Sequence, residues 1–161
     1  VIAVGKIFDI FDGEGVTEKI KTTGNTNGIA FTKALQTRDF EGLAFVNLVD
    51  FDMLYGHRRD VAGYAAAATE FDKFVADFIP GMREGDILMV TADHGCDPSY
   101  TKTTDHTREY VPYLICGKGV KPGVDLGTRL CFGTIAQTIC DYLGVDASTL
   151  DGQSVLSDIL K

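Results

Sequence analysis

The fold is decided by residues 42–95, which read GLAFVNLVDFDMLYGHRRDVAGYAAAATEFDKFVADFIPGMREGDILMVTADHG. Two continuous apolar runs, at 42–49 and 86–92, have the length and the β-branched content of buried strands. Between them, residues 61–79 carry apolar side chains at spacings of three and four, which predicts an amphipathic helix that ends at Pro80. These apolar positions are Tyr64, Ala67, Ala68, Phe71, Phe74, Val75 and Phe78. The stretch therefore predicts a strand–helix–strand unit.

The same alternation continues on both sides of this unit. The further predicted elements are a strand at 1–7, a polar loop at 15–28, a helix at 29–38, a strand at 110–117 and a helix at 132–144. Pro112 indicates that the strand at 110–117 lies at an edge or starts irregularly. Apolar strands that alternate with helices are typical of a parallel sheet with helices on both faces. The sequence predicts an α/β fold, with three α/β/α layers and a mostly parallel sheet.

Three polar loops follow the predicted strands. They occupy residues 6–9, residues 50–60 and the segment that starts at Asp93. Parallel strands of one sheet have their carboxyl ends at the same edge, where open α/β sheets bind ligands. We expect a ligand site where these loops meet.

Composition narrows the class of function. The chain has 161 residues, of which 45% are hydrophobic and 24% charged, and its formal net charge is −8 at pH 7. These values predict one globular domain. The negative charge argues against a nucleic-acid or anionic-membrane surface. An anionic substrate would need cations between itself and the protein.

The cysteines indicate where in the cell the protein is located, and the first residues indicate that the sequence is part of a longer protein. The four cysteines include no CxxC pair, so we expect reduced packing residues of a cytoplasmic protein, with a disulfide pair as the alternative. No apolar run approaches about 18 residues, and no signal-peptide pattern is present. Because the sequence opens on the apolar run VIAVGKIFDIF without a methionine, we expect that it was cut from a longer protein.

Every histidine of the chain lies close to an aspartate. His94 and His106 directly follow one, and His57 follows Asp52 by five residues. A single Asp-His pair in a loop is usually solvated surface, but three at one sheet edge are typical of a divalent metal site. Two ions about 3.5–4 Å apart can clamp a phosphoryl group. The predicted metal ligands are Asp52, His57, Asp93, His94 and His106.

Several motifs resemble those of the phosphopentomutases, a family within the alkaline phosphatase superfamily. They are NLVDFDMLYGHRRD at 47–60, TADHGCDP at 91–98 and TDHTREYVP at 104–112, with VIAVGKIFDIF and KTTGNTNG similar to the stretch before them. The DHG element marks the superfamily, whereas DFDMLYGHRRD and DHTREYVP point to the family. The resemblance covers most of the chain.

The resemblance implies a reaction and its cofactors. It implies a dimanganese enzyme that interconverts α-D-ribose 1-phosphate and ribose 5-phosphate, and the deoxyribose pair, through a phosphothreonine primed by a sugar bisphosphate. Asp93 and His94 would bind one Mn²⁺. The other Mn²⁺ would be bound by Asp52, His57 and His106. Lys6 matches a lysine near the substrate phosphate, with an ordinary strand-end lysine as the alternative.

The resemblance also implies site components outside this chain. In the family, the nucleophilic threonine, a further metal-binding aspartate and a cap domain precede the matched region. Residues 1–161 are therefore expected to be the C-terminal part of the core domain, with no catalytic nucleophile of their own. The hydroxyls that could reach the edge do not match the nucleophile motif; they belong to Thr22, Thr23, Thr103 and Thr104. The loop from Asp93 to His106 is one residue longer than the family pattern.

The missing components bear on what the chain can do by itself. We expect the chain alone to lack mutase activity, and we expect an exposed sheet edge to favour self-association or pairing with the missing N-terminal part. One alternative is a related metal-dependent phosphoglycerate mutase, phosphatase or phosphodiesterase. The other is a non-catalytic metal-binding module.

Overall fold

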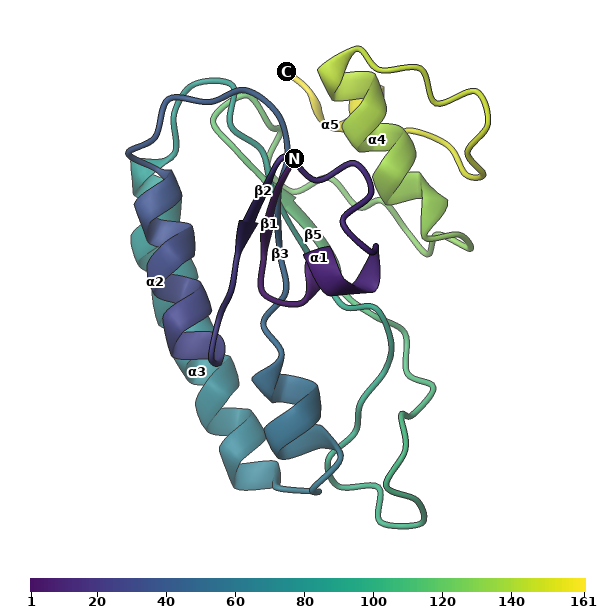
Figure 1. The fold of residues 1–161 in the computed structure, drawn as a ribbon. Helices are drawn as coiled ribbons and strands as arrows, with labels where there is room; N and C mark the ends of the chain where they lie inside the picture. The colour runs from purple at the N-terminus through teal and green to yellow at the C-terminus, as the bar shows by residue number, and fades with distance from the viewer. The chain divides into compact units, whose positions relative to one another are not determined.

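The computed structural model describes residues 1–161 and confirms an α/β fold (Figure 1). The chain forms two compact units, one of Val1–Arg83 with Val90–Tyr113, the other of Glu84–Met89 with Leu114–Lys161. None of the helices combines the length and the apolar character needed to cross a membrane.

The first unit contains a three-stranded parallel sheet in the order β2-β1-β3. Its central strand, Ile2–Val4 (β1), pairs with Glu18–Ile20 (β2) on one side and with Ala44–Val46 (β3) on the other. All three residues of β1 are buried, and Ile2 and Val4 form a hydrophobic cluster with Leu35. The strands predicted at 1–7 and 42–49 are confirmed, with shorter bounds.

The predicted loop at 15–28 is wrong, because it contains β2 and the start of a helix. The charged side chains of β2 hid the strand from the apolar pattern. Glu18 accepts two hydrogen bonds from Arg38, at 2.7 and 2.8 Å, and Lys19 pairs with Asp9 at 2.5 Å. An edge strand tolerates such polar side chains because it is not buried on both faces. A short helix absent from the prediction, Ile7–Ile10 (α1), follows β1.

Helices Asn25–Leu35 (α2) and Val61–Phe78 (α3) pack beside one another in the first unit (Figure 1). The helix predicted at 61–79 is confirmed, and a 3₁₀ turn at Ile79–Gly81 ends it. The helix predicted at 29–38 begins earlier, at Asn25. The amide of Asn25 donates to Asp50 Oδ2 at 2.7 Å, and the amide of Asp50 donates to Asn25 Oδ1 at 2.9 Å. This reciprocal pair fixes the start of α2 to the segment after β3.

The strands predicted at 86–92 and 110–117 are confirmed as Leu88–Thr91 (β4) and Tyr113–Cys116 (β5). They form a two-stranded sheet with each other, whereas the prediction had one sheet for all strands. An apolar run identifies a strand but not its neighbour, because every strand offers the same backbone hydrogen-bonding groups. β5 begins directly after Pro112, as the proline indicated.

The second unit contains Gly133–Leu143 (α4) and Leu156–Ile159 (α5). α4 confirms the helix predicted at 132–144, and Gly144 ends it in the left-handed conformation. The hydroxyl of Thr138, fully buried, accepts from the amide of Val155 at 3.1 Å. All four cysteines of the chain are free thiols.

Candidate metal centre

A π-helix, Phe51–Gly56, occupies the segment predicted as a loop after β3. The amide of His57 donates to the carbonyl of Asp52 at 3.0 Å, a hydrogen bond that spans five residues. In an α-helix, residues five apart point about 140° away from each other. The wider π turn brings them to one side, and His57 Nε2 lies 3.3 Å from Asp52 Oδ1. Such π turns are frequent at functional sites.

Phe51 anchors this π-helix on α3. Its ring contacts Tyr64 edge-on, with centroids 5.3 Å apart, and Phe71 at 6.5 Å. Edge-to-face aromatic pairs of this kind stabilise a contact beyond the apolar area they bury. Tyr64 and Phe71 are two of the apolar positions that predicted α3, and they also hold the segment that carries Asp52.

The second ligand-bearing segment is the loop at residues 93–109. An isolated antiparallel bridge between Gly95 and Thr107 closes its base, with the Thr107 amide donating to the Gly95 carbonyl at 3.1 Å. A Cβ on Gly95 would lie 2.7 Å from the amide nitrogen of Glu109 and 2.8 Å from the carbonyl oxygen of Thr107. The glycine of the DHG motif is thus required by the close approach of two chain segments.

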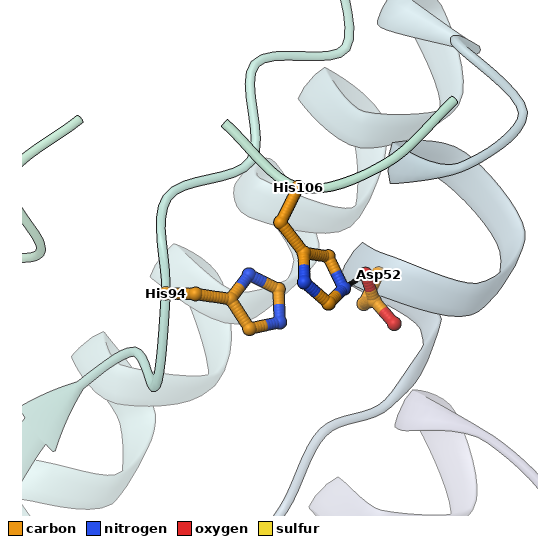
Figure 2. A group of neighbouring side chains, drawn as sticks. All are labelled: Asp52, His94 and His106. Atoms are coloured by element: carbon orange, nitrogen blue, oxygen red, sulfur yellow. Dashed lines mark ion pairs between the residues drawn. The ribbon is translucent and has the colours of Figure 1, made fainter. Parts of the chain in front are cut away.

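The bridge brings His94 and His106 together, because each directly precedes a bridged residue. Their rings stack with centroids 3.6 Å apart and planes inclined by 21° (Figure 2). His106 Nε2 lies 3.4 Å from Asp52 Oδ1, the ion pair that Figure 2 draws as a dashed line. One possible ligand atom each from Asp52, His94 and His106 lie within 4.8 Å of one another.

Backbone carbonyls orient two of the imidazoles. His57 Nδ1 lies 2.5 Å from the Thr104 carbonyl oxygen, and His94 Nδ1 lies 3.0 Å from the Gly95 carbonyl oxygen. A carbonyl oxygen only accepts, so the proton of each neutral ring is on Nδ1 and the lone pair is on Nε2. Metal-binding histidines are commonly held in this way.

The carboxylate of Asp52 supplies the observation that tests the fit to a metal. Its Oδ1 is buried and has no hydrogen-bond partner, although two Nε2 atoms face it at 3.3 and 3.4 Å. Two atoms that bind one ion at about 2.0–2.2 Å lie about 3.0–3.5 Å from each other. A buried carboxylate oxygen without a partner is costly unless a cation compensates it. The donor set of imidazole nitrogen and carboxylate oxygen therefore fits a divalent transition metal.

Asp93 and Lys6 lie at the margin of this cluster. The Asp93 side chain is 78% exposed, with Oδ1 3.6 Å from His94 Nε2. Lys6, which follows β1, is exposed and reaches the π-helix, where its Nζ lies 2.7 Å from Met53 Sδ. The structure thus gathers Asp52, His57, His94 and His106 closely, with Asp93 beside His94 and Lys6 beside the π-helix.

Electrostatics distinguish Cys96 from these residues. Burial, followed by the negative charge of Asp52, raises the pKa of the Cys96 thiol. Burial, then the nearby Cys96 and Asp52, likewise raises the pKa of Tyr64. The Cys96 side chain packs against Gly56, where an added Cβ would lie 2.3 Å from its Sγ.

Sequence reasoning missed Arg59 and Thr107. Arg59 donates to backbone carbonyls of the loop, and the Thr107 hydroxyl accepts from the Asp97 amide at 2.6 Å. Neither residue is a usual metal ligand, and the loop groups that they bind here lie 10 to 46 residues away in the chain. The only signal was their position inside the motifs that carry the histidines.

Comparisons with known proteins show the family of the chain and the proteins that it is similar to. Residues 4–147 match the family described as the metalloenzyme superfamily. The chain is 54% identical to a phosphopentomutase of Acetivibrio thermocellus over 99% of its own length and 41% of that protein. It is 53% identical to a phosphopentomutase of Lachnoclostridium phytofermentans over 100% of its own length and 41% of that protein. The chain thus spans about two fifths of the length of these relatives.

Proposed function

The chain belongs to the metalloenzyme superfamily, and from this premise we propose that it provides divalent-metal ligands of a phosphopentomutase, a metal-dependent isomerase. The observation that carries the metal site is the buried, unpartnered Oδ1 of Asp52 facing two histidine nitrogens. The choice of this isomerase rests on the phosphopentomutases that are similar to this chain over nearly its whole length.

We propose a role for each residue of the cluster. Asp52, His57 and His106 would hold one ion, because His57 and His106 face the same carboxylate oxygen. Asp93 and His94 would hold a second ion. When bound, divalent ions of this kind neutralise charge on a transferring phosphoryl group. The proposed ions are Mn²⁺.

The protein groups around the ions would bind and orient the substrate. Lys6 would bind a substrate phosphate, because its ammonium is exposed and donates to the thioether of Met53, a weak acceptor. With a net charge of −8, the protein would repel a phosphorylated sugar without such positive groups. Cations at this site would allow the acidic protein to bind the phosphorylated sugar, because they separate the two negative charges.

The remaining chemistry is proposed from the resemblance. The substrates would be ribose 1-phosphate and ribose 5-phosphate or their deoxyribose counterparts, with a phosphothreonine intermediate and a sugar bisphosphate activator. The nucleophilic threonine would come from a part of the enzyme that the matched relatives contain and this chain does not align with. The chain alone would then be inactive as a mutase. We also propose a cytoplasmic location and pairing through the sheet edge.

Metal binding by the purified chain tests the first part of the proposal. Isothermal titration with Mn²⁺ should give saturable binding that His57→Ala and His94→Ala each weaken. Lys33→Ala is the matched control, because its side chain pairs with Asp77 on the exposed faces of α2 and α3. Saturable binding that neither histidine substitution weakens would refute the assignment.

Activity tests the second part in a chimera. This chain would replace the corresponding 160 residues of the Acetivibrio thermocellus relative, to which it is 54% identical. We expect Mn²⁺-dependent conversion of ribose 1-phosphate to ribose 5-phosphate, abolished by Asp52→Ala. The folded chimera is also tested against other phosphate esters. If it has no activity on pentose phosphates but converts 3-phosphoglycerate or hydrolyses a nitrophenyl phosphate, the chain belongs to a related phosphotransfer enzyme.

A further inference from the structure

Arg59 joins the two segments that carry the candidate metal ligands. Its guanidinium donates five hydrogen bonds to backbone carbonyl oxygens. Nε and Nη2 donate to Thr103 at 2.9 and 2.5 Å, and Nη2 also donates to Asp105 at 2.5 Å. Nη1 donates to Gly56 at 3.0 Å and to Asp97 at 3.2 Å. One side chain therefore ties the end of the π-helix to both ends of the loop at residues 97–105.

The backbone of Arg59 indicates that these contacts hold it under strain. Its φ angle is +56°, in the left-handed region that residues with a Cβ rarely adopt. Such a conformation persists only where surrounding interactions over-determine it. The side-chain hydrogen bonds to the loop are interactions of that kind.

The loop carbonyls that Arg59 binds lie next to the groups that orient two histidines. Thr103 and Asp105 flank Thr104, whose carbonyl oxygen accepts the hydrogen bond from Nδ1 of His57. Asp105 directly precedes His106, which contacts Asp52. Movement of residues 103–105 would release the His57 ring and displace His106 together.

We infer that Arg59 is a positioning residue for the metal centre, an inference that rests on the proposed function of that centre. It holds the loop closed before any ion binds, so that His57 presents Nε2 and His106 lies beside Asp52. Lysine cannot replace it, because one ammonium lacks the planar fork of five N–H donors that reaches four carbonyls in different directions.

Loop opening in the metal-free chain is the first measurement. Lys102 is exposed inside the clamped loop, so brief trypsin treatment followed by mass spectrometry measures cleavage after Lys102. Arg59→Lys and Arg59→Gly should each raise this cleavage rate at least about tenfold, because several charge-assisted hydrogen bonds are lost. Arg58→Lys is the matched control, since Arg58 is exposed and its side chain makes no hydrogen bond.

The two variants separate positioning from backbone strain. Glycine is free of strain at a φ of +56°, so Arg59→Gly relieves the backbone while it removes the guanidinium. If Arg59→Gly behaves like the unaltered chain in cleavage, the guanidinium does not hold the loop and the inference is overturned. Circular dichroism of each variant confirms that the helices persist.

The protonation site of His57 is the second measurement, and a purely structural role would leave it unchanged. Imidazole ¹⁵N spectra of the metal-free chain should place the His57 proton on Nδ1, and both Arg59 variants should shift it toward a mixture of Nδ1 and Nε2 forms. Mn²⁺ affinity should also fall about 10–100-fold, as for other residues that orient metal ligands. An unchanged tautomer in both variants would overturn the inference.

These measurements also separate the inference from the proposed function. An unaltered chain that binds no Mn²⁺ would refute the proposed metal centre. Cleavage and tautomer measurements need no ion, so they would still decide whether Arg59 closes the loop and orients His57.

Discussion

Two segments supply the candidate ligands, and they are built in different ways. The π-helix Phe51–Gly56 positions Asp52 and His57 through a backbone hydrogen bond between residues five apart. The loop at residues 93–109 positions His94 and His106 without regular secondary structure, through one bridge and through side chains that bind backbone groups.

The two segments therefore differ in whether residues near or far away in the sequence determine their geometry. The geometry of the π-helix follows from neighbouring residues and from Phe51 packed on α3. The geometry of the loop depends on Arg59, which lies 38 to 46 residues away from the carbonyls that it binds there. Groups from the two segments meet at Asp52 Oδ1. Substitution of Asp52 should therefore have the largest effect on metal binding, and substitutions within either segment should have smaller effects.

Asp52→Ala removes the carboxylate that His57 and His106 face, and its effect on Mn²⁺ affinity should be the largest. Mn²⁺ affinity should fall at least about 100-fold, because a direct ligand contributes more than the residues that orient it. The metal-free chain should not lose stability, since its buried oxygen lacks a hydrogen-bond partner. Titration calorimetry and urea denaturation measure the two effects. Asp72→Ala, on the exposed part of α3, is the control, and equal affinity of the two variants would contradict the site.

Gly95→Ala breaks the loop segment at its base. The new Cβ would meet backbone atoms of Glu109 and Thr107 at 2.7 and 2.8 Å, and such overpacking costs about 1–3 kcal/mol. We expect a lower free energy of unfolding in denaturant, together with weaker Mn²⁺ binding. Gly119→Ala is the matched control, because nothing lies within 4 Å of the added Cβ there. Equal stability of both variants would show that the bridge can open without loss.

Much of the fold could be predicted from the sequence where burial is strong. The α3 helix shows apolar spacing over its whole length, and β1 is a fully buried apolar strand. β2 could not be predicted, because its charged side chains form ion pairs at the sheet edge. The partner of β4 could not be predicted either, since pairing depends on how the chain returns and not on the residues of the strand alone.

The sequence predicts which residues are candidate ligands but not the geometry that brings them together. Histidine and aspartate types pointed to Asp52, His57, His94 and His106, which the fold brings together. The π turn leaves no distinct residue pattern, because its apolar and polar spacing resembles that of an irregular loop. The clamp by Arg59 needs a left-handed backbone and distant carbonyls, and neither is visible in a linear sequence.

Asp60→Ala changes the segment directly after the π-helix. The Asp60 side chain caps α3 by accepting from the Gly63 amide at 2.9 Å. Its loss should lower the free energy of unfolding by about 0.5–2 kcal/mol. Cleavage after Lys102 should not change, because the cap acts on α3 and not on the loop. Asp60→Asn should keep the stability, since asparagine caps equally well. Faster loop cleavage in Asp60→Ala alone would mean that the two segments are not independent.

Ser99→Ala probes the loop side with the smallest expected effect. The Ser99 hydroxyl, and then its amide, donate to Asp97 Oδ1 at 2.6 and 2.8 Å and lower the pKa of that carboxyl. Because the folded pKa lies below the unfolded one, the stabilisation is complete above about pH 4 and is lost as the pH falls further. Ser99→Ala should raise the pKa of Asp97 toward its ordinary value in a carboxyl ¹³C titration. Asp146 is the internal control, because hydrogen bonds from Ser148 also lower its pKa and the substitution should leave that pKa unchanged. An unchanged pKa of Asp97 would show that the Ser99 hydroxyl does not order this turn.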